Sequence, residues 1–435
     1  MKIMTPPKKS SKAVKKSTKK KTTKKTTKKL SKKDVKKPAK SSTKKVIKES
    51  VKKKTSKKTT KKISKKTSTK KTTKSVVKKP STAKTSKAVV KKGVSKTSSK
   101  KQVQKPKNQT KEVKEEEKGE KELTEEEKTQ KEEEEKEKKL RYDSFKKAGE
   151  IHKQVIKFIK PKVKIGAKLL DICEQTESKL IELGGEIGFP TNVCINEIAA
   201  HYSSPPNDES VIKKGDVVKV DIGVSVEGYV ADGAFTISFN QDPTTANLVT
   251  AVETAVMKGL SIIKPGVKTI EVGKTTAKII RGFGYNPIKD LRGHSLEKWQ
   301  VHGFKSIPSV GISSGDVFEE GDVFALECFA STGLGNIHNG TNCNIYEYDL
   351  NSERVPIRMK ITRQVIGWIA NIKKTLPFST RELLKEFRTG KMALRELTTA
   401  GKLHKHYELR EQKGAYVSQF EKTFIVTEDG IEIFN

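Results

Sequence analysis

The sequence predicts an α+β fold made from a duplicated unit and preceded by a disordered lysine-rich tail. Three observations lead to this prediction. Near residue 140, a highly charged, low-complexity segment changes to alternating apolar and polar residues. Residues 218–239 have the pattern of a β-hairpin that carries two aspartates. Two pairs of similar segments also recur in the same order along the chain, which indicates an internal repeat.

The first 110 residues form a tail of Lys, Ser and Thr. They hold 44 lysines and only two acids, so their net charge is +42, whereas the rest of the chain carries −2. Such a segment has too few apolar residues to offset the entropy of folding, and its like charges repel, so we expect disorder. Its lysines could bind ribosomal RNA or DNA through salt-dependent phosphate contacts, or the tail could serve only as a solubilising extension.

The next segment is a predicted linker, and the cysteine pattern indicates the redox compartment of the folded part. Residues 111–140 are blocks of Glu and Lys, which predict a solvated, partly helical linker. The four cysteines lie far apart without a CxxC pair, as is typical of a reduced, intracellular protein. No apolar run approaches the ~20 residues of a membrane helix, and no signal peptide precedes the tail. We therefore expect no membrane partner and take the cytoplasm as the default location, although a KKxKK-type tract in the tail could also serve as a nuclear signal. A monomer is the default oligomeric state.

The folded domain is expected at residues 141–435. Apolar residues at spacings of three and four within 145–158 predict a first amphipathic helix. A second helix is expected at 166–183, followed by a strand and loop, GEIGFPTNVCINEIAAHY, that end at His201. The spacing of apolar residues also predicts the later elements. These are helices at 247–263 and 270–281, strands within 290–348, a mostly helical stretch at 356–410, and a final strand in YVSQFEKTFIVT.

The hairpin VKVDIGVSVEGYVADGAFTISF holds the most informative residues. Its apolar and polar residues alternate on both sides of a turn at Glu227 and Gly228. That turn pairs Asp221 with Ala234 and Gly223 with Asp232, so the aspartates become diagonal neighbours on one face, roughly 7–8 Å apart. Two buried carboxylates facing one space repel each other and lose hydration. A metal ion between them is the usual remedy, although backbone donors could satisfy either aspartate alone.

The repeat relates this hairpin to a second acidic strand. IKPKVK at 159–164 is similar to IKPGVK at 263–268, and KKGDVVKVD at 213–221 is similar to EEGDVFALE at 319–327. Asp221 and Glu327 end the two matched strands. Two such units related by a pseudo-two-fold axis would bring both acids toward one central site.

Five strand-borne residues are candidate metal ligands: Asp221, Asp232, His294, Glu327 and Glu421. An oxygen-rich set with one imidazole suits two hard or borderline divalent ions rather than a thiolate zinc site. Two such ions can share a hydroxide that acts as a nucleophile at neutral pH. His201 and His302 lie among apolar or small residues, where a histidine can donate a hydrogen bond to a developing oxyanion.

Five spaced motifs resemble the type 2 methionine aminopeptidases: FPTNVCINEIAAHY, KVDIGVSVEGYVADGAFTISF, GHSLEKWQVHG, ALECFASTG and QFEKT. The resemblance runs from about Tyr142 to the C-terminus. It implies the duplicated pita-bread (creatinase/aminopeptidase) fold. The stretch at about 350–408 would be the helical insertion of type 2 enzymes. The basic tail would engage ribosomes or ribosomal RNA, as in the eukaryotic style of this enzyme.

The same resemblance assigns a role to each site residue. The implied cofactors are two divalent ions (Co, Mn, Fe, Zn or Ni). Asp221 would bind one ion, His294 and Glu327 would complete the other, and Asp232 and Glu421 would bridge both. His201 and His302 would contact substrate at the scissile bond and act in catalysis. Phe189 and Val301 would line the pocket for the methionine side chain. The expected reaction is removal of the initiator methionine from nascent polypeptides with a small second residue, by a metal-bridged hydroxide.

The sequence departs from the family pattern at two positions, and two alternative functions remain open. The family usually has His after the bridging glutamate, where this chain has Lys422. A pocket tyrosine lacks a clean counterpart, with His406 or Tyr407 in its place. One alternative is a non-enzymatic ribosome- or RNA-binding relative on the same fold, against which all five ligands argue. The other is an Xaa-Pro aminopeptidase or prolidase, which would be expected to carry a large separate N-terminal domain.

Overall fold

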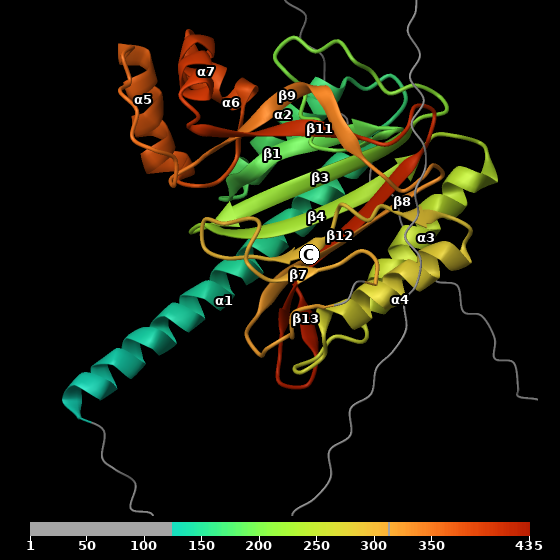
Figure 1. Ribbon diagram of the computed structural model, residues 1–435, viewed down its shortest axis with the longest axis horizontal. Helices are drawn as coiled ribbons and strands as arrows, with labels where there is room; N and C mark the ends of the chain where they lie inside the picture. The colour runs from blue at the N-terminus through green and yellow to red at the C-terminus, as the bar shows by residue number, and fades with distance from the viewer. Residues whose placement is uncertain (1–123, 312–313) are drawn as a thin grey trace, which may run out of the picture. The chain divides into compact units, whose positions relative to one another are not determined.

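The computed structural model describes residues 124–311 and 314–435 (Figure 1). The predicted disordered tail, residues 1–110, lies outside the described residues. A long helix, α1 (Glu125–Ile159), begins with a capping box in which Thr124 and Glu127 satisfy each other's backbone N–H groups. Its first turns are solvent-exposed and fall within the Glu/Lys segment, whereas Phe145, Ala148 and Ile151 are buried. No helix in the described ranges is long and apolar enough to cross a membrane.

The first half of the domain is a three-stranded antiparallel sheet covered by two helices. The strands are β1 (Glu186–Ile195), β3 (Val217–Val226) and β4 (Tyr229–Ser238), in the order β1-β3-β4. Helix α1 and helix α2 (Leu169–Glu182) bury their apolar faces against this sheet. The predicted hairpin register is confirmed, since Asp221 pairs with Ala234 and Gly223 with Asp232.

The second half repeats this arrangement with α3 (Pro243–Leu260) and α4 (Thr269–Gly282) packed on the next sheet (Figure 1). Its central strands are β8 (Val323–Ser331) and β12 (Val417–Val426). Shorter strands complete the sheet: β5 (Asn286–Pro287), β6 (Gly293–Ser295), β7 (Ser306–Ile307) and β13 (Ile431–Ile433). The two sheets meet along β4 and β12, where Thr236 Oγ1 donates to the Gln419 carbonyl and Thr423 Oγ1 to the Asp232 carbonyl.

Backbone hydrogen bonds show the duplication residue by residue. Gly215 N donates to the Phe239 carbonyl, as Gly321 N does to that of Val426, so the predicted match of 213–221 with 319–327 is correct. The match of 159–164 with 263–268 is wrong by four residues. Gly166 N donates to the Ile212 carbonyl as Gly266 N does to that of Phe318, so residues 164–168 correspond to 264–268. The earlier IKP instead forms the short 3-10 helix η1 (Lys160–Lys162) at the end of α1.

An insertion between β8 and β12 carries its own sheet and helices. The sheet has the order β10-β9-β11-β2 and takes in β2 (Ile198–Ala200) from the first half. The other elements are β9 (His338–Tyr348), α5 (Lys360–Trp368), the π-helical turn η2 (Ile369–Lys373), β10 (Phe378–Ser379), α6 (Thr380–Glu386), α7 (Gly390–Thr399) and β11 (Leu403–Arg410). The helical prediction for 356–410 is therefore wrong at its end. Gly401, with φ at 65°, follows α7, and the chain then pairs with β9 as a strand.

Candidate metal centre

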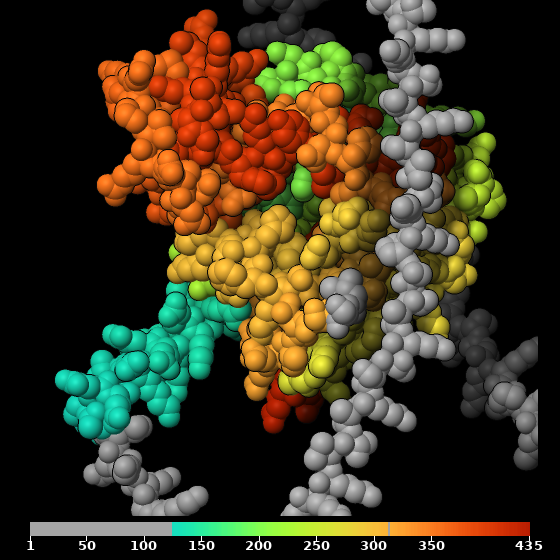
Figure 2. All heavy atoms as spheres, viewed as in Figure 1, coloured from blue at the N-terminus to red at the C-terminus, as the bar shows by residue number. Residues whose placement is uncertain are grey.

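A cavity of about 200 Å³ lies where the two halves and the insertion meet. Figure 2 shows a hollow between the orange and red insertion and the yellow segment near residue 300. All nine side chains predicted for the site line this cavity: Phe189, His201, Asp221, Asp232, His294, Val301, His302, Glu327 and Glu421. The structure therefore brings the predicted residues together, while the role of each stays a prediction.

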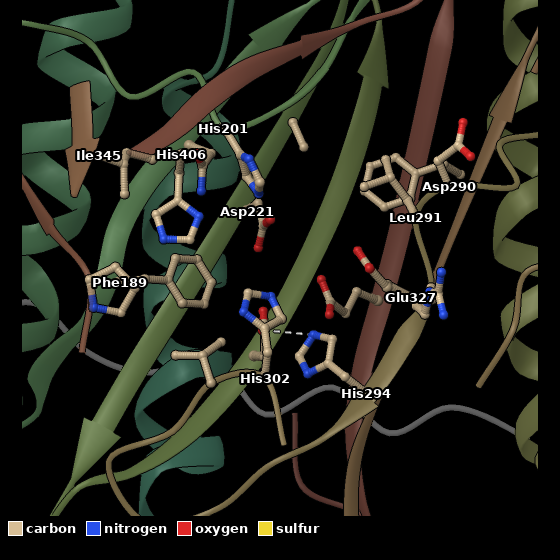
Figure 3. Close-up of a pocket in the computed structure, with 18 residues that line it drawn as sticks. Phe189, His201, Asp221, Asp290, Leu291, His294, His302, Glu327, Ile345 and His406 are labelled. Carbon is tan, nitrogen blue, oxygen red and sulfur yellow. Dashed lines mark ion pairs between the residues drawn. The ribbon is translucent and has the colours of Figure 1, made fainter. Parts of the chain in front are cut away.

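Two pairs of strands supply the four carboxylates. Asp221 on β3 and Asp232 on β4 are diagonal neighbours across the hairpin, because Asp232 faces Gly223. Glu327 on β8 lies directly opposite Glu421 on β12. The meeting of β4 and β12 brings the two pairs to one space, and Figure 3 shows the side chains of Asp221 and Glu327 pointing into the same cavity. The fold thus concentrates negative charge at the join between its duplicated halves.

Asp232, His294 and Glu421 already converge. Each offers one donor atom, and these atoms lie within 4.8 Å of one another. His294 Nε2 is 3.9 Å from an Asp232 carboxylate oxygen, the contact that is dashed in Figure 3. Burial lowers the pKa of His294 to about 3, so this ring is neutral at neutral pH. All three side chains are buried, at 2 to 6% exposed. This spacing allows one small cation to contact three side chains at once.

Buried atoms without a hydrogen-bond partner mark the same place. Among the described residues, Asp221 Oδ1, Asp232 Oδ1, Glu421 Oε1 and His294 Nδ1 are such atoms. A buried carboxylate oxygen without a donor is costly unless a cation faces it. The donor set has four carboxylates and one imidazole, which suits divalent ions of the first transition row. The residues present therefore fit a metal centre.

The electrostatics agree with this interpretation. Burial raises the pKa of Asp221 to about 6. Burial and the neighbouring carboxylates raise the pKa values of Asp232, Glu327 and Glu421 well above the usual range. The side chains gain protons because no positive charge of the described chain compensates them. A divalent ion would supply that charge and reverse the shifts.

An amide side chain bridges two of the acids. Gln419 Nε2 lies 3.1 Å from an Asp221 carboxylate oxygen and 3.3 Å from a Glu421 oxygen. Sequence reasoning missed this residue, although its place two residues before Glu421 on a strand puts both on one face. Gln419 holds two predicted ligands in a fixed orientation.

Four histidines line the cavity. The rings of His201 and His406 are 5.5 Å apart between centroids, and those of His294 and His302 are 4.6 Å apart. Burial, followed by the neighbouring imidazoles, lowers the pKa of His201 to about 3 and also lowers that of His302. Both rings are therefore neutral at neutral pH, and each can donate one N–H.

The two ends of the cavity differ in chemistry. One end is apolar and is built by Phe189, Val301 and Ile345, as Figure 3 shows for Phe189 and Ile345. The other end carries the segment Asp290–Leu291–Arg292. Ile345 and this segment were not predicted for the site. His406 was named only as one of two residues that could stand in the place of the pocket tyrosine, and of these two it is His406 that lines the cavity.

Comparisons with known proteins identify the relatives of this chain. The family model described as metallopeptidase family M24 matches residues 143–428. The methionine aminopeptidase of Thermococcus onnurineus is 42% identical over 290 residues, which cover 66% of this chain and 97% of that protein. Methionine aminopeptidase 2 of Schizosaccharomyces pombe is 33% identical over 305 residues, covering 66% of this chain and 70% of that protein. The solved structure of a thermophilic Arx1 has a TM-score of 0.60 at 22% identity and covers 67% of this chain and 90% of that one, a likeness of fold alone. The predicted duplicated α+β pita-bread fold is confirmed.

Proposed function

The chain belongs to metallopeptidase family M24 as a methionyl aminopeptidase, and from this premise we propose that it removes the initiator methionine from nascent proteins with a small second residue. One observation carries this proposal. Four carboxylates and a buried histidine, with unpartnered donor atoms on Asp221, Asp232, Glu421 and His294, face a cavity whose other end is apolar. Such a cavity can hold a methionine side chain beside a metal-activated nucleophile.

The family implies divalent metal ions, and the proposal assigns five residues to two of them. Asp221 would serve one ion, His294 and Glu327 the other, and Asp232 and Glu421 would bridge both. The ions, whether cobalt, manganese, iron, zinc or nickel, would lower the pKa of bound water and so supply hydroxide at neutral pH. Gln419 supports this set because its amide holds Asp221 and Glu421 in place.

The remaining residues would bind and orient the substrate. Phe189 and Val301 would contact the methionine side chain in the apolar end of the cavity. Neutral His201 and His302 would each donate an N–H toward the carbonyl oxygen of the first peptide bond, where negative charge develops. A bulky second side chain would meet His201 and the metal ligands, so we expect a preference for a small one.

Further details of the proposal rest on the insertion and the tail. The insertion lies between Glu327 and Glu421 in the sequence and supports assignment to type 2. The enzyme acts on N-termini of polypeptides, and the +42 charge of residues 1–110 supports an additional contact with ribosomal RNA. Nascent-chain processing would take place in the cytoplasm, and we propose a monomer.

Neither alternative function is favoured. A non-enzymatic relative would be expected to lose ligands, yet all five line the cavity. An Xaa-Pro aminopeptidase or prolidase would not explain the likeness to proteins named methionine aminopeptidase over nearly their whole length. Both observations therefore favour a methionine aminopeptidase over the two alternatives.

Peptide cleavage tests the proposal directly. Purified protein is incubated with Met-Ala-Ser, Met-Lys-Ser and Ala-Pro-Ser in the presence of cobalt or manganese, and released amino acids are quantified. We expect methionine from Met-Ala-Ser alone. Efficient cleavage of Met-Lys-Ser would contradict the second-residue preference. Absence of turnover with every divalent metal, by a folded protein, would favour the binding relative.

A further inference from the structure

A second cavity, of about 290 Å³, adjoins the first and is not used by the proposed reaction. We call it the vestibule. It shares Val301, His302, Pro377 and His406 with the first cavity and adds Gln300, Glu347, Thr375 and His404. Most of these side chains can form hydrogen bonds or bind a metal. The vestibule is thus a polar space behind the apolar end of the substrate cavity.

The sheet of the insertion brings three metal-ligating side chains to one face of the vestibule. His404 and His406 lie two residues apart on β11, so both rings project from the same side of the strand. Glu347 on β9 is the direct cross-strand partner of His404. Three donor groups therefore lie on two adjacent, paired strands.

The distances approach those of a metal site. His406 Nε2 lies 3.1 Å from a Glu347 carboxylate oxygen, and the His404 and His406 rings are 4.7 Å apart between centroids. Two ligands of one tetrahedral ion with ~2.1 Å bonds are separated by roughly 3.4 Å. Glu347 and His406 already have nearly this separation, and the His404 ring is adjacent.

We propose that His404, His406 and Glu347 form a second, independent site for a borderline divalent ion such as Zn²⁺. Two imidazoles and a carboxylate are a donor set that zinc, nickel and copper prefer. Across residues 124–311 and 314–435, the only three donor atoms that already converge within 4.8 Å are those of Asp232, His294 and Glu421. The vestibule site therefore forms when the exposed His404 ring turns toward Glu347.

Occupation of this site has a consequence for the first cavity. His406 lines both cavities, so an ion that binds it would fix its ring at the passage between them. The apolar end would then lose room to adapt to the methionine side chain. Zinc in excess of the amount needed for catalysis should thus inhibit cleavage. This inhibition rests on the proposed function, whereas the binding of zinc in the vestibule is independent of it.

Metal counting tests the site. Wild-type protein, His404→Ala and Glu347→Gln are dialysed against Zn²⁺, and bound zinc per chain is measured. His338→Ala is the matched control, because His338 is an exposed histidine at the other end of β9. We expect His404→Ala and Glu347→Gln to bind one zinc fewer per chain than wild type, and His338→Ala to bind the same number.

Inhibition provides the second readout. Cleavage of Met-Ala-Ser by wild type and His338→Ala should fall as zinc rises, whereas His404→Ala should keep its activity. Equal zinc counts in wild type and His404→Ala, or an equal loss in His338→Ala, would overturn the vestibule site. If no variant cleaves the peptide under any condition, the proposed function fails, and the zinc counts still decide the vestibule site.

Discussion

Arg381 of the insertion and Glu177 of α2 form a buried ion pair, with side chains 2% and 4% exposed. The same guanidinium donates to the Ser203 hydroxyl and to the Ser204 carbonyl. These serines follow His201, whose φ of 64° is unusual for a residue with a side chain and must be held by its surroundings. Arg381 therefore fastens the insertion to the first half, next to a predicted catalytic histidine.

Replacing Arg381 should affect both stability and turnover. Arg381→Met leaves the Glu177 carboxylate buried without its partner, which should cost about 3–5 kcal/mol in the free energy of unfolding. The loop after His201 loses its donors, so kcat for Met-Ala-Ser should fall more than KM changes. Urea unfolding and steady-state kinetics at a temperature where the variant is folded measure the two effects.

A second buried pair in the insertion is the control for Arg381. Lys373 contacts Glu382 at 3.1 Å and the Ile187 carbonyl at 3.0 Å, and its amine donates to neither Ser203 nor Ser204. Lys373→Met should lower stability comparably and leave kcat nearly unchanged. If both variants lose kcat equally, the contact of Arg381 with the serines has no special part in positioning His201.

Metal content should separate ligands from substrate-binding residues. Glu421→Ala removes a carboxylate that faces Glu327 and should abolish both metal retention and activity. His201→Ala should retain the metal and lower kcat about 10²–10³-fold, the usual effect of losing one oxyanion donor. Elemental analysis of each purified variant checks this. A metal-free His201→Ala protein would show that the histidine is a ligand.

The features that could be predicted from the sequence are those that depend on residues close together in the chain or on a repeated segment. The hairpin register was predictable because alternation and one turn decide every pairing between Val217 and Ser238. Convergence of Asp221 with Glu327 followed from the repeat, since equivalent strands of a duplicated unit meet at its pseudo-axis. The nine site residues that line the cavity come from these signals and from the motif resemblance.

The parts that were missed depend on contacts distant in sequence. The helical pattern of α7 hid the change to a strand after Gly401, so the placement of His406 in the cavity required its pairing with β9. The contact of Gln419 with Asp221 spans 198 residues. The offset of the first repeat match was wrong because a chance IKP similarity outweighed the positive-φ Gly166 and Gly266 that truly correspond.

The raised pKa of Asp221 predicts an unusual pH dependence for the metal-free protein. Its folded pKa of about 6 exceeds the ordinary 3.8, so the ionised side chain destabilises the fold above pH 6. Asp221→Asn removes this penalty and should raise the free energy of unfolding at pH 7 by about 3 kcal/mol. The advantage should shrink as pH falls below 6, be small at pH 4 and vanish below about 3, where Asp221 is protonated in both states.

Denaturant unfolding of metal-free wild type and Asp221→Asn at pH 7, 6, 5 and 4 checks this dependence. Saturating metal should reverse the order, because asparagine cannot supply the negative charge that binds the ion. A constant difference across this pH range would mean that Asp221 ionises normally in the fold.

Deleting the basic tail should separate catalysis from localisation. Every residue that lines the substrate cavity lies between Phe189 and Glu421, so removal of residues 1–110 should leave kcat/KM for Met-Ala-Ser unchanged. The deletion also removes 44 lysines, whose phosphate contacts release counterions, so ribosome co-sedimentation should weaken strongly at low salt and little at high salt. A variant that keeps the tail length but has Ser in place of Lys should behave like the deletion, because charge rather than length carries the binding. Co-sedimentation that is unchanged by either variant would leave the tail as a solubilising extension.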